Sequence, residues 1–222
     1  MRVLAVSAHP DDETLGCGGT LLKHRSAHDE MYWLIATQVF EPRWSSAVIT
    51  TKAEEVTRVA EAYGMKEVFP LRRCTARLDT VPRAELIEAV ANVIAQTRPE
   101  IVYVVHGGDV HTDHQVVFAS TMAVLKPSYM ARAGVRRILA FEVLSSTEAA
   151  PATADQHFVP TVFSDITSVL ENKLAIMALY ESEAHADPFP RGPSAIRALA
   201  RLRGATIGVE HAEAFMLVRE LV

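Results

Sequence analysis

The chain has 222 residues, of which 49% are hydrophobic and 22% are charged. This composition is typical of one folded domain with a large core, and it argues against disorder. The formal net charge is −5 and the isoelectric point is about 6.0, which argues against nucleic acid or an anionic membrane surface as the main partner.

We expect a cytoplasmic protein without an integral membrane segment. Residues 1–13 turn acidic too early for a signal peptide. No apolar run approaches the length of a membrane-spanning helix. Cys17 and Cys74 are the only cysteines, and two distant cysteines do not make a disulfide framework, so a reducing compartment fits.

The first half of the chain alternates strand-like and helix-like patterns. Apolar runs typical of strands in a parallel sheet occupy residues 2–8, 31–40, 67–71 and 101–105. Helical spacing of apolar residues occupies 12–26, 45–65, 82–100 and 113–126. Gly64 suits the C-cap of the second helix, and Pro82 suits the start of the third.

The second half of the chain is less regular. Its expected elements are a strand within 136–146, a loop at 147–156, helices at 164–183 and 193–204, and a last strand at 213–221. Ser164 or Asp165 is the expected N-cap of the first of these helices. The whole order predicts a single α/β domain over residues 1–222, with a Rossmann-like, doubly wound, mostly parallel sheet and an irregular C-terminal third.

Two clusters of histidines and acids follow two of the expected strands. The first is "HPDDE" at residues 9–13, and the second is "HGGDVHTDH" at residues 106–114. Taken alone, each cluster could be an ordinary acidic helix start. However, parallel neighbouring strands end at the same edge of a sheet, where ligands of such folds bind, so we expect the clusters to meet.

The residue types in these clusters are those of a catalytic zinc site. Two histidines and one carboxylate with an open position for water can hold Zn²⁺, and a further acid beside the metal can serve as a general base. His111 and His114 are three residues apart and share one face of a helix that begins there. Spacing alone does not decide which of Asp11, Asp12 and Asp113 binds the metal.

The two motifs resemble the zinc-dependent de-N-acetylases of the PIG-L/LmbE type. "AHPDDE" followed by "GCGGTLLKH" is similar to the first block of that family, "HTDHQVV" is similar to its second, and the C-terminal segments "KLAIMALYESE" and "LARLRGATIGVEHAEAFMLVREL" look like those of some members. The resemblance implies a homo-oligomeric enzyme that removes acetyl from an N-acetyl amino sugar or glycoconjugate.

The resemblance also implies roles for individual residues. His9, Asp12 and His114 would bind zinc, and Asp11 would be the general base. His111 would be the general acid or would stabilise the oxyanion, and Asp113 would tune His111.

The chain departs from the family pattern in two places that bear on the substrate. "ATQVFEPRW" replaces a "T-D-G"-like turn, and "DPFPRGPS" replaces an "H-P-R-S" segment. Arg191 is the candidate for the arginine of that segment, and Arg43, Trp44 and Arg191 are candidates for a sugar-binding rim. Trp44 could stack on a sugar ring or belong to the core. Glu213 is a weaker site candidate.

Other interpretations of the same residues remain open at this stage. His106 is expected to be structural, and Cys17 a small buried residue. The glycines at 16–19 fail the dinucleotide pattern because Leu21 takes its last position. The alternatives are a zinc amidohydrolase acting on a non-sugar amide or amino-acid conjugate, and a non-catalytic metal- or nucleotide-binding module. The spare acid and base, Asp11 and His111, favour catalysis, because structural zinc sites are closed by four protein ligands.

Overall fold

The computed structural model describes residues 1–154 and 156–222. Within them lies one seven-stranded sheet of order β3-β2-β1-β4-β5-β7-β6. The strands are β1 (Arg2–Ser7), β2 (Glu30–Gln38), β3 (Glu67–Cys74), β4 (Ile101–Val105), β5 (Arg137–Phe141), β6 (Val162–Asp165) and β7 (Ala212–Glu220). The first five are parallel, whereas β7 runs antiparallel to both β5 and β6. The expected mostly parallel sheet is confirmed.

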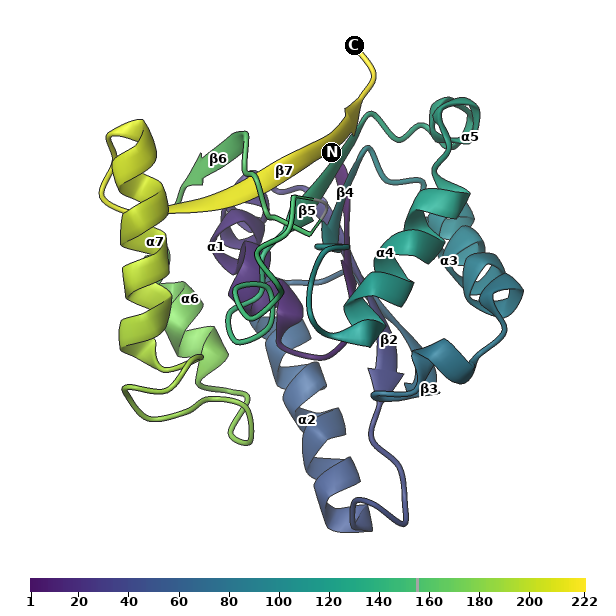
Figure 1. Cartoon of the computed structure of the whole chain (residues 1–222), viewed down its shortest axis with the longest axis horizontal. Helices are drawn as coiled ribbons and strands as arrows, with labels where there is room; N and C mark the ends of the chain where they lie inside the picture. The colour runs from purple at the N-terminus through teal and green to yellow at the C-terminus, as the bar shows by residue number, and fades with distance from the viewer. Residues whose placement is uncertain (155) are drawn as a thin grey trace.

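Helices cover both faces of this sheet, as a doubly wound fold requires (Figure 1). One face carries α1 (Asp12–Ser26), α2 (Ser46–Tyr63), α6 (Leu170–Met177) and α7 (Pro193–Ile207), and the other carries α3 (Arg83–Thr97), α4 (Thr112–Val124) and α5 (Pro127–Ala133). A short 3-10 helix, η1 (Leu78–Thr80), follows β3. In the described part of the chain, no helix combines the length and the apolarity needed to cross a membrane.

The central strands explain why the apolar runs are continuous. Val3 to Ser7 of β1 and Val102 to Val105 of β4 are buried, because helices lie over both faces of the sheet. The glycines of α1 serve the same packing: a Cβ on Gly16 would lie 2.0 Å from Phe141 of β5. A Cβ on Gly18 would meet Tyr63 of α2 and one on Gly19 would meet Ile166, so these glycines serve close packing, consistent with the failed dinucleotide pattern.

The expected helix over 164–183 is wrong at both ends, since α6 ends at Met177. Ser164 and Asp165 are the last residues of β6, which pairs with β7, and α6 begins only at Leu170. The pairing partner lies about fifty residues further along the chain, so local pattern could not indicate this edge strand. The expected loop at 147–156 includes residue 155, which lies outside the described residues; 147–154 contain no helix or strand.

The sheet places the two clusters side by side. β1 pairs with β2 on one side and with β4 on the other, and α1 and α4 leave these strands toward opposite faces. A crevice forms at such a divergence, beyond the carboxyl ends of the strands. The segments after β1 and β4 both enter it.

Candidate metal-dependent active site

The turn after β1 is held by the side chain of Asp12. Its Oδ2 accepts hydrogen bonds from the backbone N–H groups of Ala8 (2.9 Å) and His9 (2.8 Å), and the side chain is buried. Its other oxygen, Oδ1, lies 3.3 Å from Nε2 of His114. The carboxylate therefore shapes the turn with one oxygen and faces the second cluster with the other.

The turn after β4 is held in the same way by Asp109. Its Oδ1 accepts the N–H of His111 (2.8 Å), and its Oδ2 accepts the hydroxyls of Ser146 (2.8 Å) and Thr147 (2.6 Å). His111 is the N-cap of α4, where its Nδ1 accepts the N–H of Asp113 (3.2 Å). These contacts start α4 so that His114 points toward β1.

Three residues from the two clusters bring possible ligand atoms close together. Nδ1 of His9 and Nε2 of His114 are 3.2 Å apart; Oδ1 of Asp12 lies 3.3 Å from Nε2 of His114, and Oδ2 of Asp12 lies 3.7 Å from Nδ1 of His9. Ligands about 2.05 Å from a tetrahedral Zn²⁺ lie ~3.3 Å from one another. We call His9, Asp12 and His114 the donor triangle; the separations of Nε2 of His114 from Nδ1 of His9 and from Oδ1 of Asp12 match that spacing. The ligand atoms of His9, His111 and His114 also lie within 4.8 Å of one another, so His111 borders the same point.

The electrostatics of the triangle favour a positive charge there. Burial opposes protonation of His114, but Asp12 and Asp109 outweigh it and raise its pKa to about 10. Burial likewise opposes protonation of His9, and Asp113 and Asp12 raise its pKa to about 9. A divalent cation would satisfy the same carboxylates and leave both imidazoles neutral, the form in which histidine binds metals.

A carboxylate stands behind each histidine of the triangle. Oδ2 of Asp109 is 3.1 Å from Nδ1 of His114, and Oδ2 of Asp113 is 3.1 Å from Nε2 of His9. Such carboxylates orient a metal-binding imidazole and increase its basicity. The Asp113 carboxylate contacts His9, and Asp113 reaches His111 by its backbone N–H and by its charge, which counteracts the lowering of the His111 pKa. Tuning of His111 by Asp113 stays a prediction, with His9 as the directly contacted partner.

Asp109 was not expected to be a site residue, although the sequence carries a signal for it. It precedes His111 by two residues within the second cluster. Nothing in that spacing indicates that its partner is His114, since the contact depends on how α4 begins.

Asp11 is held in a strained conformation beside the triangle. Its φ of 104° is left-handed, a region that non-glycine residues occupy mainly where the surrounding structure imposes it. Its N–H donates to Oε2 of Glu13 (3.2 Å), and its Oδ2 accepts from Nη1 of Arg191 (2.9 Å). Burial raises the pKa of its carboxyl and Arg191 counteracts the rise, which suits a proton acceptor better than an ordinary exposed aspartate.

His111 is placed to donate a hydrogen bond. Its Nδ1 accepts a backbone N–H, so the proton of the neutral ring is on Nε2. Burial and the neighbouring His9 and His114 lower its pKa, and the charges of Asp113 and Asp12 oppose this only in part; the net effect favours the neutral ring.

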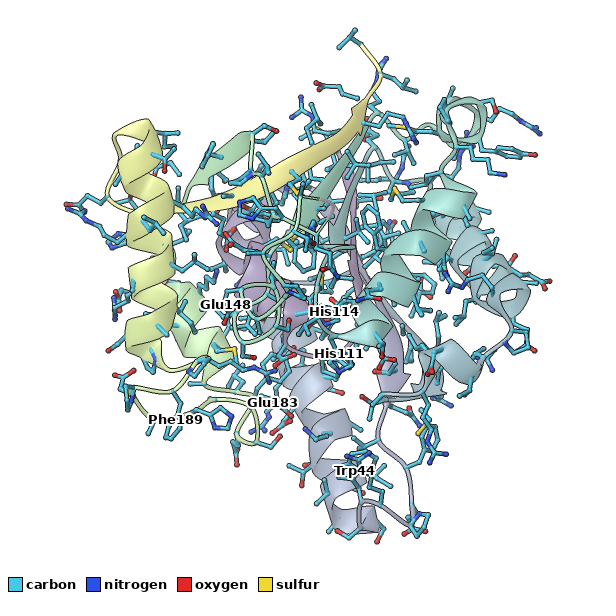
Figure 2. All side chains as sticks on the ribbon, viewed as in Figure 1. Trp44, His111, His114, Glu148, Glu183 and Phe189 are labelled. Carbon is cyan, nitrogen blue, oxygen red and sulfur yellow. The ribbon has the colours of Figure 1, made fainter. Side chains whose placement is uncertain are left out.

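A cavity of about 680 Å³ opens onto the triangle and reaches Trp44. Figure 2 shows Trp44 toward the far end of α2 from His111 and His114. Trp44 is thus a cavity residue and not part of the core. Arg43 stacks on it, with its guanidinium 4.6 Å from the ring centre, but is not among the residues that line the cavity.

Arg191 does line the cavity, yet its guanidinium is already engaged. Nη1 contacts both Asp11 (2.9 Å) and Glu183 (2.7 Å), and Nε donates to Ser145 (3.0 Å). Arg191 therefore holds Asp11 at the cavity, and its place on a sugar-binding rim stays a prediction.

Comparison with known proteins agrees with this geometry. The family model of PIG-L, described as GlcNAc-PI de-N-acetylase, matches residues 4–125. The chain belongs to the PIG-L family. The matched PIG-L region contains the donor triangle, Asp11 and His111, and ends before Arg191 and Glu213.

Individual relatives have low sequence identity to the chain, but their similarity covers more than half of it. The chain is 25% identical to diacetylchitobiose deacetylase of Thermococcus kodakarensis, over 98% of this chain and 83% of the relative. It is 28% identical to 1D-myo-inositol 2-acetamido-2-deoxy-alpha-D-glucopyranoside deacetylase of Kineococcus radiotolerans, over 56% of this chain and 44% of that protein. Among solved structures, a conserved protein of Thermus thermophilus matches with a TM-score of 0.79 and 23% identity, over 100% of this chain and 97% of the other.

Three other sequence candidates lie outside the site of this PIG-L domain. Nε2 of His106 contacts the backbone oxygen of Gln156 (3.1 Å), and Cys17 is buried at a kink of α1, as expected for structural residues. Glu213 accepts hydrogen bonds from the N–H groups of Gly19 and Thr20 and from Lys173. Its role is to stabilise the second half of the kinked helix α1.

Proposed function

We propose that this chain is a zinc-dependent hydrolase that removes the acetyl group from an N-acetylated amino sugar, of N-acetylglucosamine type, and releases acetate and a free amine. The observation that carries the proposal is the donor triangle with Asp11 and His111 beside it, neither of which is needed as a metal ligand. Membership of the PIG-L family and the deacetylase names of the relatives support the reaction and the class of substrate.

His9, Asp12 and His114 would hold the metal ion. When bound, Zn²⁺ supplies a Lewis acid that polarises the amide carbonyl and acidifies water. Asp109 and Asp113 keep the two imidazoles in the orientation that directs Nε2 of His114 and Nδ1 of His9 to one point.

Asp11 and His111 would carry out the proton chemistry. Asp11 takes a proton from the attacking water, and Arg191 holds its carboxylate in place. The Nε2–H of His111 donates to the amide oxygen as negative charge develops there. The proton held by Asp11 then passes to the nitrogen as the C–N bond breaks, because a neutral amine is the better leaving group.

Two further proposals follow: the family resemblance indicates that the chain forms homo-oligomers, and its two distant cysteines fit a reducing compartment such as the cytoplasm. Sedimentation velocity of the purified protein tests the first, and fractionation of expressing cells tests the second.

The experiment is metal analysis combined with acetate release. Untagged protein is incubated with N-acetylglucosamine, chitobiose, UDP-N-acetylglucosamine and a glucosaminyl lipid headgroup, with zinc and with other divalent metals. We expect about one metal ion per chain and acetate from at least one compound. Protein that binds no metal even after reconstitution would overturn the proposal.

The variant Asp11→Asn tests the assignment of the base. It should keep the metal and lose about 10²–10⁴-fold in kcat. Asp79→Asn, at an exposed acid in η1, is the matched control and should retain activity. Wild-type turnover by Asp11→Asn would refute the role of Asp11.

A further inference from the structure

The cavity above the donor triangle extends well beyond the reacting centre. Its volume of about 680 Å³ lies in the range of sites that enclose drug-sized ligands, ~300–1,000 Å³. Its lining includes the triangle, Asp11 and His111. It also includes a group from α2 and β3 that we call the apolar wall: Ile49, Ala53, Val56, Ala60, Val68 and Pro70.

The apolar wall includes a continuous face of α2, since its four members on that helix recur at helical spacing. Residues 49, 53, 56 and 60 share one face of an α-helix, and they are half-buried or exposed. A neighbouring face of α2 anchors it: Val59 and Tyr63 are buried, and the Tyr63 hydroxyl donates to Oγ1 of Thr14 in α1 (3.0 Å). Helix α2 is thus fixed by one face while an apolar face borders the cavity.

The charged groups that line the cavity are either paired with one another or exposed to solvent, so an apolar group on the wall does not bury an unpaired charge. Lys52 pairs with Glu183 (2.6 Å), which pairs in turn with Arg191 at Asp11. Glu61 and Arg72, which also line the cavity, are exposed to solvent, so their charges stay hydrated when the wall is covered. The cavity therefore has a polar, charge-paired end at the reacting centre and an apolar side along α2.

We propose that the apolar wall binds a hydrocarbon or aromatic group on the amine side of the substrate, so that the preferred substrate is an N-acetyl amino sugar bearing an apolar aglycone. This rests on the proposed function, in which the released acyl group is a two-carbon acetyl. Anything larger that fills the cavity then belongs to the amine product. Apolar area left open to water has no favourable partner, and an apolar aglycone supplies one.

Methyl, butyl and hexyl N-acetyl-β-D-glucosaminides test the wall directly. Each methylene buried against it should lower KM about fourfold, from ~0.8 kcal/mol per CH₂, with kcat nearly unchanged because this contact is the same in the ground and transition states. Calorimetric Kd values for the same glycosides should fall in parallel.

The variant Ala53→Trp places a large side chain on the wall and should abolish the dependence of KM and Kd on chain length. Thr51→Trp is the matched control, since Thr51 is exposed and on the opposite side of the same helix; it should keep the wild-type dependence. Circular dichroism melting of both variants tests whether they are folded. The dependence of KM and Kd on chain length in the wild-type enzyme tests the proposal even if a variant does not fold.

Each outcome tests either the role of the apolar wall in substrate binding or the proposed deacetylase activity. Equal KM and Kd across the glycosides would overturn the apolar wall and leave deacetylation standing. Tightening Kd without acetate release would support the wall and contradict the proposed function. A preference for N-hexanoyl-glucosamine over the hexyl glycoside would assign the wall to the acyl arm, against our proposal. A length-independent KM together with a change of oligomeric state in Ala53→Trp would assign it to contact between copies of the chain.

Discussion

Replacing Asp113 by asparagine separates two interpretations of this acid. Its carboxylate is fully buried and accepts hydrogen bonds from the backbone N–H groups of Ala76 (2.6 Å) and Leu78 (3.1 Å), while Oδ2 lies 3.1 Å from Nε2 of His9. The N–H of Ala76 bonds to Oδ2 and that of Leu78 bonds to Oδ1, so asparagine keeps the acceptor for one of them, loses it for the other and removes the charge behind His9. The lost hydrogen bond costs about 1–3 kcal/mol, which is less than the stability of an ordinary domain. We therefore expect the fold to persist and the metal site to weaken.

The expected size follows from known carboxylate–histidine pairs at metal sites. Losing such a partner costs about 10–100-fold in metal affinity, or ~1.4–2.7 kcal/mol. Zinc affinity is measured by competition with a chromophoric chelator, and kcat is measured at saturating zinc. Asp79→Asn again serves as the control with an exposed acid. Unchanged zinc affinity with a large fall in kcat at saturating metal would refute the contact with His9 as the functional one, and would favour action on His111.

Three further predictions concern stability. Glu213→Ala leaves the buried ammonium of Lys173 without its carboxylate at 2.8 Å and should cost about 3–5 kcal/mol, a fall of ~6–20 °C in Tm; a loss below about 1 kcal/mol in urea unfolding would contradict it. Gly16→Ala puts a Cβ 2.0 Å from Phe141 and should cost ~1–3 kcal/mol by the same assay. Adding zinc to chelator-treated protein, at about 100 times Kd, should stabilise it by ~2.7 kcal/mol, and an unchanged melting curve would count against binding at the donor triangle.

The sequence by itself determined the architecture around the site. Continuous apolar runs at β1 and β4 predicted central buried strands, because only strands covered on both faces lose their polar positions. Parallel pairing then required the segments after both strands to meet at one edge. That topology brings together the segments that contain His9, Asp12 and His114, and the resemblance to the family chose these residues as ligands.

The tertiary structure decided which group each side chain contacts. Asp113 contacts His9 across 104 residues, and Arg191 contacts Asp11 across 180 residues. The pairing of β6 with β7 was equally invisible to local pattern. An acid beside a histidine in sequence can face any of several partners, and the direction in which a helix starts selects one of them. Local periodicity reports which face of an element is buried, whereas these contacts depend on distances between elements that only the packed chain sets.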